Sequence, residues 1–383
     1  MKRSLIFFSL LLGEHALAQD KPQPREMEMC KVQIELYCQF EREQKDFREI
    51  LKCLAKNDDK LSTECKQEFQ RFAQASRQTT PPGGGPLGAL GGLTGLGSQA
   101  PSLFYEGRFI QGSNDSPETP SFLESNLNTS VPVFKTEKNT VAVTLGGGNL
   151  HLSEPVILSS GTKVSTNFYK ADVGLQYSRS LENKRRFGLL GSVGYSGDKL
   201  DTDTQSFNVS ANYSFPGSND NQWVLMVMMS NNSPLGTFVP VPGFFYIYRT
   251  STFTGLFGLP ILSIQWTPVN PWSFSFSVFG PTLKTEVAYG EIDKTQFFTG
   301  FGWKQQRYLL SERTNKDERL TIEEKNAEIG FRRPLFQGVF SEFQTGYTFD
   351  RSIYLGEGLF NKDGGSADLD SSWYLKWSVK VTF

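Results

Sequence analysis

The sequence predicts an all-β transmembrane barrel of about twelve antiparallel strands, preceded by a small disulfide-stapled α-helical module. Segments in which apolar and polar residues alternate recur from about Thr136 to the C-terminus. The chain contains 32 Phe and 36 Gly, yet its mean hydropathy is −0.36. A barrel reconciles these two properties, because only alternate residues of each strand face lipid. The cysteines all fall before residue 66, which separates a cysteine-containing part from the barrel.

Residues 1–18 have the pattern of a secretory signal peptide. Lys2 and Arg3 are followed by the apolar run Leu5–Leu12, which is too short to span a bilayer, and by Ala16-Leu17-Ala18, which is typical of a cleavage site. A buried N-terminal helix is the alternative. The signal peptide is favoured because the basic start and the Ala-x-Ala end occur together.

Residues 19–78 are predicted to form a cysteine-rich helical module. The segment around its cysteines is rich in Glu, Lys, Gln and Leu and lacks Gly and Pro, which is typical of helices. An even number of cysteines in an exported segment indicates two disulfides. We favour Cys38–Cys53 and Cys30–Cys65 as nested staples of antiparallel helices, although the sequence allows three connectivities. A zinc site is the alternative, but the close cysteine pairs of such sites are missing.

The cysteine segment resembles a known repeat. Cys53-Leu54 and "LSTEC" at Leu61–Cys65 are similar to a cysteine-rich repeat found in tandem in Golgi glycoproteins and singly in bacterial exported proteins. This resemblance implies a disulfide-held interaction module without chemistry of its own. A periplasmic protein or another envelope component is the partner we expect for it.

Two connecting segments follow the module. Residues 79–102 are rich in Gly and Pro without periodicity, which predicts a flexible linker. Glycine loops that bind phosphate need a preceding strand and a following helix with Lys, and neither is present here. Residues 103–135 are mostly polar with scattered Pro, which predicts an extended lead-in or a plug.

Residues 136–383 are predicted to form the barrel. "FNVSANYSF" at Phe207–Phe215 and "WSFSFSVF" at Trp272–Phe279 alternate most clearly. About twelve or thirteen such segments are present, and twelve is chosen because single-chain bacterial barrels have even strand numbers. A soluble β-sandwich would also alternate, but the aromatic residues near segment ends favour the interfacial girdles of a membrane barrel. The segments begin near Val141, Ala171, Phe187, Phe207, Trp223, Phe244, Leu259, Trp272, Leu283, Phe297, Ile322, Val339 and Trp373.

The C-terminal stretch "SSWYLKWSVKVTF" ends on an aromatic residue, as a lipid-facing last strand would. Together with Leu259–Gly290 and "GYTFDR" at Gly346–Arg351, it resembles a family of bacterial outer-membrane barrels catalogued as a domain of unknown function. This resemblance implies fold and location and supplies no activity. The end of the chain also resembles the signal read by the outer-membrane barrel assembly machinery, carried here by Trp373, Trp377, Val379, Val381 and Phe383.

Charged residues occupy the positions that we expect to face the lumen. On neighbouring strands opposite charges can meet across the ladder, which predicts a mixed, self-pairing lining. A ring of one sign would indicate an ion-selective filter, and none is evident. One segment differs, because Val224, Met226 and Met228 make both of its faces apolar, which predicts packing or a patch for a lipid-like solute. The candidate lumen charges are Lys284, Glu286, Lys304, Glu324, Glu328, Arg332, Glu342, Lys376 and Lys380.

These features predict a bacterial outer-membrane protein with its module in the periplasm and long polar loops outside. The first functional hypothesis is a pore or channel for small polar solutes. The alternative is a closed structural or adhesive barrel that displays loops and binds a periplasmic partner. A remote alternative is a lipid-modifying hydrolase built on His151 and Ser153, because residues two apart in a strand share a face. We expect no enzyme, no metal and no organic cofactor, and the net charge of −1 argues against nucleic-acid binding.

Overall fold

The computed structural model describes two compact units, which fall within Met1–Thr80 and Pro81–Phe383. The predicted signal peptide and nearly all of the predicted linker lie outside the described residues. Within the described residues, no helix is both long and apolar enough to cross a membrane. The described residues are 30–38, 47–66, 101–112, 119–218, 221–233, 235–250, 252–269, 271–291, 294–313, 315–336, 338–358 and 361–383.

The first unit consists of short helices, as predicted. Its elements are α1 (Lys31–Tyr37), α3 (Phe47–Lys56) and the 3-10 turn η2 (Asp58–Lys60). A further helical turn begins after Ser62, whose hydroxyl accepts a hydrogen bond from the backbone N–H of Cys65 at 3.2 Å. Such a side-chain cap satisfies a donor that the first turn of a helix leaves free.

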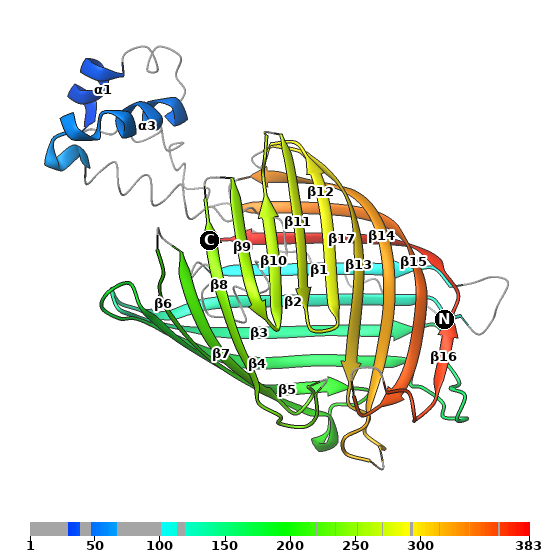
Figure 1. Ribbon diagram of the computed structural model, residues 1–383. Coiled ribbons are helices and arrows are strands. Elements are labelled where there is room, and N and C mark those ends of the chain that lie inside the picture. The colour runs from blue at the N-terminus through cyan, green and yellow to red at the C-terminus, as the bar shows by residue number, and fades with distance from the viewer. Residues whose placement is uncertain are drawn as a thin grey trace, which may run out of the picture. The chain divides into compact units, whose positions relative to one another are not determined.

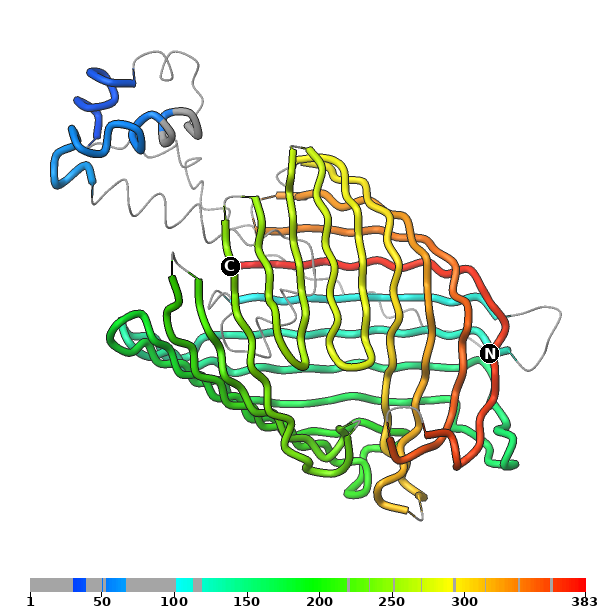
Figure 2. Tube along the Cα trace, viewed as in Figure 1, coloured from blue at the N-terminus to red at the C-terminus, as the bar shows by residue number. Residues whose placement is uncertain are grey.

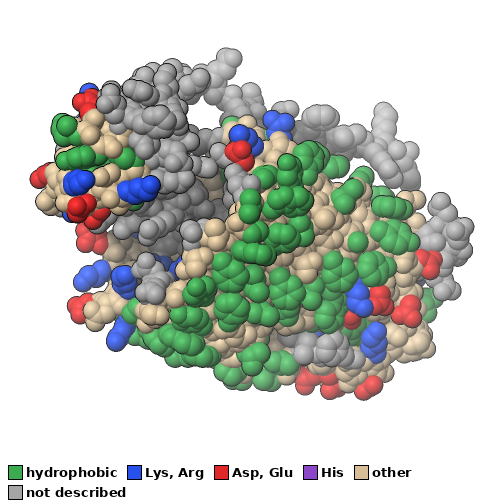
Figure 3. Space-filling view, turned by 45° about the horizontal axis from the view of Figure 1, so that its top comes forward, with side chains coloured by type: hydrophobic (Ala, Val, Ile, Leu, Met, Phe, Trp, Pro, Cys, Tyr) green, Lys and Arg blue, Asp and Glu red, His purple; other side chains and the backbone are tan. Residues whose placement is uncertain are grey.

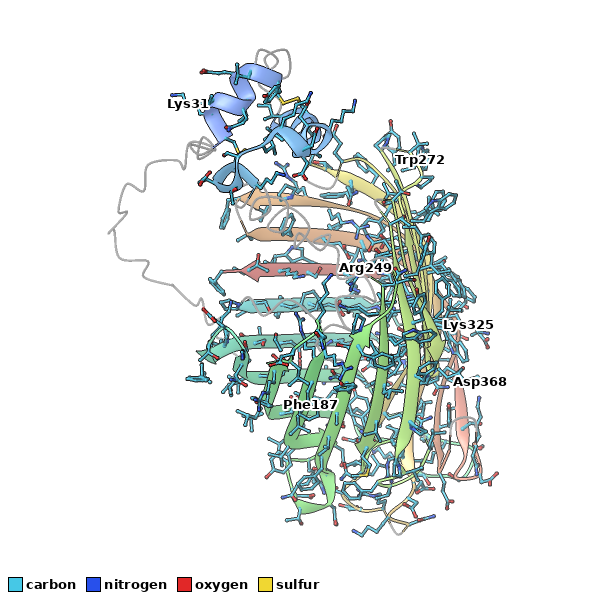
Figure 4. All side chains as sticks on the ribbon, turned by 60° about the vertical axis from the view of Figure 1, so that its left-hand side comes forward. Lys31, Phe187, Arg249, Trp272, Lys325 and Asp368 are labelled. Atoms are coloured by element: carbon cyan, nitrogen blue, oxygen red, sulfur yellow. A yellow bond between two sulfur atoms is a disulfide. The ribbon has the colours of Figure 1, made fainter. Side chains whose placement is uncertain are left out.

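Two disulfides hold this unit together. They join Cys30 to Cys65 and Cys38 to Cys53, which confirms the predicted nested pairing. The four cysteines are buried around Leu54. A yellow sulfur–sulfur bond is visible beside the helices in Figure 4. In a unit this small the disulfides supply stability that the few apolar side chains cannot.

The second unit is one antiparallel sheet. It contains 17 strands, and β16 pairs only with β15, so the remaining sixteen form the ring. The ring closes where β1 pairs with both β2 and β17. The strands are β1 Ser102–Ile110, β2 Phe122–Lys135, β3 Asn139–Leu152, β4 Asn167–Ser180, β5 Arg186–Gly197, β6 Gln205–Pro216, β7 Gln222–Ser230, β8 Val241–Arg249, β9 Phe253–Leu259, β10 Ile261–Trp266, β11 Trp272–Phe279, β12 Thr282–Tyr289, β13 Gln296–Tyr308, β14 Arg319–Phe336, β15 Val339–Gly356, β16 Ser366–Leu369 and β17 Ser372–Thr382.

The predicted number of twelve strands is wrong, although every predicted segment coincides with a strand. The expected lead-in or plug at residues 103–135 is also wrong, because it contains β1 and β2 of the wall. These strands escape a search for apolar alternation, since β1 has apolar Phe104 and Ile110 on its inner face and β2 has Ser125 and Thr129 on its outer face. β9 was not predicted either, because the predicted segment starts at Leu259 and coincides with β10 alone, which Pro260 separates from β9.

The two ends of the barrel differ. The end at which the strand region begins and finishes has short connections, and we call it the turn end. The opposite end carries the long connections, including residues 309–318 and 357–371, and we call it the long-loop end. In Figure 4, Trp272 at the turn end and Asp368 at the long-loop end lie far apart along the barrel.

The outer face of the wall is apolar. In β17, Trp373 is 61% exposed and Trp377 46%, whereas the intervening Tyr374 is 2% exposed, so the predicted alternation is confirmed. Figure 3 shows a broad hydrophobic surface on one face of the molecule, with charged side chains toward its margin. Aromatic pairs such as Trp272–Tyr289 and Trp223–Phe244 lie near the turn end, as an interfacial girdle requires.

The ring is strongly curved. In Figures 1 and 2, β1 to β3 run across behind β9 to β13. Residues on opposite sides of the ring therefore come close enough to touch near the long-loop end. The apolar core of the unit lies there, and its members are Ile110, Phe122, Leu150, Leu152, Val156, Leu158, Val164, Phe168, Tyr308, Leu320, Ile322, Ile353, Leu355, Leu369 and Tyr374.

Candidate functional site

Charged side chains gather on the inner face of the wall, and strand register aligns them. Lys304 of β13 lies directly opposite Glu324 of β14. Arg332 of β14 lies directly opposite Glu342 of β15. Directly opposed residues have Cβ atoms about 5 Å apart, so opposite charges at these positions can pair. The sequence predicted this kind of pairing, and the structure shows it.

The cluster nearest the long-loop end contains two cations and two carboxylates. Lys304 Nζ is 3.2 Å from Glu124 Oε2 and 3.4 Å from Glu324 Oε1. Arg108 pairs with Glu324 and lies 4.0 Å from Glu124 Oε2. The Arg108 guanidinium also lies 4.3 Å from the centre of the Tyr374 ring, a cation–π contact. The charges are therefore shared among several partners.

Tyr374 connects this cluster to a second one. Its hydroxyl donates to Glu328 Oε2 at 2.7 Å. Lys284 Nζ then lies 3.7 Å from Glu328 Oε1 and 3.6 Å from Glu286 Oε2. Arg332 pairs with Glu286 and reaches Glu342 at 3.4 Å. We call this continuous set the interior charge chain: Glu124, Lys304, Glu324, Arg108, Tyr374, Glu328, Lys284, Glu286, Arg332 and Glu342.

The interior charge chain crosses the inside of the barrel. Glu124 is on β2 and Lys304 on β13, and four strands of the wall separate them. Lys170 of β4 likewise reaches Gln306 of β13 at 3.5 Å, although seven steps around the ring separate these strands. Side chains on such distant strands can meet only through the interior. The burial of the interior charge chain agrees with this interior position, since Arg108 and Glu324 are each 3% exposed.

Of the predicted lumen charges, Lys376 and Lys380 stand outside the interior charge chain. Lys376 pairs with Glu106 at 2.8 Å. Lys380 makes no ion pair or side-chain hydrogen bond with any described residue. Sequence reasoning missed Arg108, Glu124 and Glu106, because β1 and β2 were not recognised as strands. The charged residues Glu106 and Arg108, two positions apart, could have indicated a strand with a polar inward face.

A contact between opposite strands closes the long-loop end. β5 and β13 are eight steps apart around the ring in either direction. Gly197 at the end of β5 nevertheless forms a parallel bridge with Leu309, just after β13, and the Leu309 N–H donates to the Ser196 carbonyl at 2.8 Å. The backbone therefore spans the mouth here.

Side chains from two connections reinforce this closure. Ser311 donates to Asp198 through its backbone N–H at 2.8 Å. Lys199 pairs with Glu312 at 2.8 Å, and Lys316 pairs with Asp203 at 2.6 Å. The Lys316 and Lys199 hydrogen bonds lower the pKa of the Asp203 and Glu312 carboxyls, respectively. We call the contacts between residues 196–203 and 309–316 the latch.

Arg319 ties a third connection to the same end. Its guanidinium donates to the Asn231 carbonyl at 2.6 Å and to Thr237 Oγ1 at 2.8 Å. Thr237 in turn donates to Asp317 at 2.6 Å. The connection between β7 and β8 is therefore held against the connection between β13 and β14.

The segment with two apolar faces packs against its neighbours. Val224 and Met226 of β7 are buried with Phe245 of β8, Leu256 of β9 and Ile261 of β10. Of the two predictions for this segment, the structure shows packing.

The proposed hydrolase pair is not formed. The His151 ring contacts Asn167 Oδ1 at 2.8 Å, and Ser153 accepts a hydrogen bond from the backbone N–H of Ser121 at 3.0 Å. His151 is exposed, whereas its neighbours Leu150 and Leu152 are buried. His151 therefore faces outward and does not orient Ser153 for nucleophilic attack. Among the described residues, no group of His, Cys, Asp and Glu side chains could hold a metal ion.

A closed antiparallel ring that is apolar outside and charged inside is the architecture of a transmembrane β-barrel. No protein-family model matches the chain, and no curated protein matches it. The two resemblances drawn from sequence therefore gain no support from these comparisons.

Solved structures of outer-membrane proteins match weakly. An outer membrane channel from Pseudomonas putida F1 shares 8% identity at a TM-score of 0.33, over 75% of this chain and 96% of that chain. A bacterial polysaccharide outer membrane secretin shares 7% identity at a TM-score of 0.33, over 74% and 99%. A deletion mutant of the TodX monoaromatic hydrocarbon channel shares 8% identity at a TM-score of 0.31, over 74% and 89%.

Proposed function

We propose that this protein is a bacterial outer-membrane β-barrel that acts as a gated pore for small polar solutes. The interior charge chain carries this proposal, because it extends from the long-loop end, at Glu124 and Arg108, toward the turn end, at Arg332 and Glu342. Ionisable groups at membrane depth are costly and typically mark solute or ion pathways. A purely structural barrel of this size could fill its interior with apolar side chains, which are often as stable as buried ion pairs.

The latch is the proposed gate. Its Lys199–Glu312 and Lys316–Asp203 pairs are exposed to water, and exposed ion pairs contribute little to stability. These side-chain contacts can therefore be lost without unfolding the wall, and opening must also break the backbone hydrogen bond from Leu309 to Ser196. Beneath the latch, the cations of the interior charge chain have more than one carboxylate partner, so side chains can exchange partners as a solute passes.

Single-channel conductance of the refolded full chain in planar bilayers tests this function. A heat-dependent gel shift first establishes that the barrel has folded. The variant Asp198→Ala/Lys316→Ala removes both hydrogen bonds that Asp198 accepts from Ser311 and the Lys316–Asp203 pair, and we expect open steps that are more frequent or longer than in the wild type. Lys294→Ala is the matched control, because it removes an exposed pair with Glu291 at the turn end.

The second candidate function is a closed structural or adhesive barrel that binds a periplasmic partner. The apolar core inside the long-loop end favours it, because these side chains fill the space beneath the latch. Under this candidate the folded wild type, the latch variant and the control all remain silent. Open steps that the latch variant increases and the control leaves unchanged would exclude it.

We place the first unit in the periplasm as an interaction module. Its α1 helix exposes Val32 and Leu36, which are 61% and 67% exposed and available for contact with a protein. Outer-membrane lipid and the barrel assembly machinery complete the proposed partners, and no enzymatic step is proposed. An epitope tag inserted after Asp363 in the long-loop end should be detected on intact cells. A tag inserted after Glu182, in the turn-end connection between β4 and β5, should be detected only after permeabilisation.

A further inference from the structure

Basic side chains gather in two neighbouring turns at the turn end of the barrel. The first turn joins β2 to β3 at residues 136–138, and the second joins β4 to β5 at residues 181–185. The backbone N–H of Ser180 donates to the Lys138 carbonyl at 2.7 Å, so the two turns lie side by side. We call residues 135–138 and 179–186 the basic rim. Its cations are Lys135, Lys138, Arg179, Lys184, Arg185 and Arg186.

The charge of the basic rim is not balanced within the rim. Its six cations face only two carboxylates, those of Glu137 and Glu182. Neither carboxylate forms an ion pair with a described residue. All of the cations are exposed except Arg186, which is half-buried. The long-loop end has the opposite sign, since its connection at residues 357–371 contains four acidic residues and one lysine. The basic rim is therefore a local cationic surface that complements an anion.

The basic rim adjoins the apolar outer face of the wall. Arg179 follows Tyr177 by two residues on β4, so both side chains project outward, and Arg179 lies directly opposite Phe187 of β5. The rings of Tyr177 and Phe187 are 6.4 Å apart in an edge contact. Phe134, just before the first turn, is 54% exposed. Aromatic rings of this kind mark the level at which acyl chains meet lipid headgroups. The cations beyond them therefore lie at the level of the headgroup phosphates.

We propose that the basic rim binds the headgroups of anionic phospholipids in the leaflet that surrounds the turn end. The lipid phosphate would accept charge-assisted hydrogen bonds from the exposed cations, while the acyl chains would contact Phe134 and the neighbouring apolar wall. A zwitterionic phospholipid fits less well, because its own ammonium group cancels the charge of its phosphate. This inference goes beyond the proposed pore, since the basic rim lies outside the lumen and can bind lipid whether or not the barrel conducts.

Spin-labelled lipids test the basic rim with the refolded full chain in phosphatidylcholine vesicles. Electron paramagnetic resonance measures the fraction of labelled phosphatidylglycerol, or of labelled phosphatidylcholine, whose motion the protein restricts. At low salt we expect phosphatidylglycerol to associate at least about threefold more strongly with the wild type. High salt should reduce this preference, because it screens exposed charges. The variant Lys138→Gln/Arg179→Gln/Arg185→Gln should lose most of the preference.

Lys163→Gln/Lys199→Gln/Lys362→Gln is the matched control, because it removes the same charge from exposed residues at the long-loop end. Each variant is compared only after its heat-dependent gel shift matches the wild type. Equal association of the two lipids with the wild type, an unchanged preference in the basic-rim variant, or an equal loss in the control would each overturn the proposal. Binding of polyglutamate without any lipid preference would assign the basic rim to an acidic protein and would also overturn it.

Conductance separates this inference from the proposed function. The basic-rim variant leaves the latch and the interior charge chain intact, so its open steps in phosphatidylcholine bilayers should match those of the wild type. A lipid preference that depends on the basic rim in a silent barrel would support the inference and contradict the pore. Open steps in a barrel without lipid preference would support the pore and contradict the inference.

Discussion

Arg108 offers the most direct test of the interior charge chain. The change Arg108→Met keeps a long side chain over Tyr374 but removes the charge that pairs with Glu324. Breaking a buried ion pair by removing one partner costs about 3–5 kcal/mol. Lys304 remains within 3.4 Å of Glu324 and within 3.2 Å of Glu124, so it offsets part of the loss. We therefore expect a loss of about 3 kcal/mol, at the lower end of that range.

The assay is urea unfolding of the refolded barrel in lipid vesicles, followed by tryptophan fluorescence. A double-mutant cycle with Glu324→Gln isolates the pair, because the double variant leaves Glu124 and Lys304 as a matched couple. The double variant should lose less than the sum of the single variants, with a coupling of about 2 kcal/mol. Lys325→Met is the control, since its pair with Asp350 is largely exposed and should contribute at most about 1 kcal/mol. Wild-type stability of Arg108→Met together with zero coupling would refute the buried, shared pairing.

Three further outcomes are expected. Replacing the Cys30–Cys65 bond with serines should cost the first unit about 3–4 kcal/mol, since the bond closes a loop of 35 residues, and limited proteolysis should cleave that unit while the barrel keeps its gel shift. The hydrogen bond with Lys316 lowers the pKa of Asp203. This contact therefore stabilises the latch fully above the ordinary aspartate pKa of about 3.9, and the stabilisation is lost as the pH falls through the lowered pKa. The latch should therefore loosen at acid pH, with more open steps in the wild type, and equal conductance at pH 7 and pH 3 would contradict this. Deleting Phe383 should sharply reduce barrel assembly in cells, and assembly at the normal level would show that the last residue is not part of the assembly signal.

Some features could be read from sequence because they depend on local chemistry. The disulfide pairing could be favoured among three connectivities, because Cys30 and Cys38 lie about two helical turns apart and can face a neighbouring helix. The outward face of β17 follows from strict alternation, because a strand places successive side chains on opposite sides. Lys304 with Glu324 and Arg332 with Glu342 could be anticipated, since consecutive antiparallel strands of a barrel are neighbours in the sheet.

Other features depend on contacts that local patterns do not encode. The sequence predicted too few strands partly because alternation is interrupted in β1 and β2. In β1, Phe104 and Ile110 are inward and apolar, and in β2, Ser125 and Thr129 are polar at outward positions. Asp350 has a positive φ of 49° at an irregularity in β15, beyond which Ile353 and Leu355 become inward and join the apolar core. Alternation counted from Phe343 would have placed both on the outer face.

The sequence by itself determined that this chain has a disulfide-held helical unit and a transmembrane β-barrel with charges on its inner face. The physical reason is that composition, cysteine spacing and a period of two act within single segments. Only the tertiary structure decided that Glu124 meets Lys304 across the interior and that Leu309 reaches Ser196 over the mouth. Those contacts join strands far apart in the ring, and the curvature of the whole sheet, which no single segment specifies, brings them together.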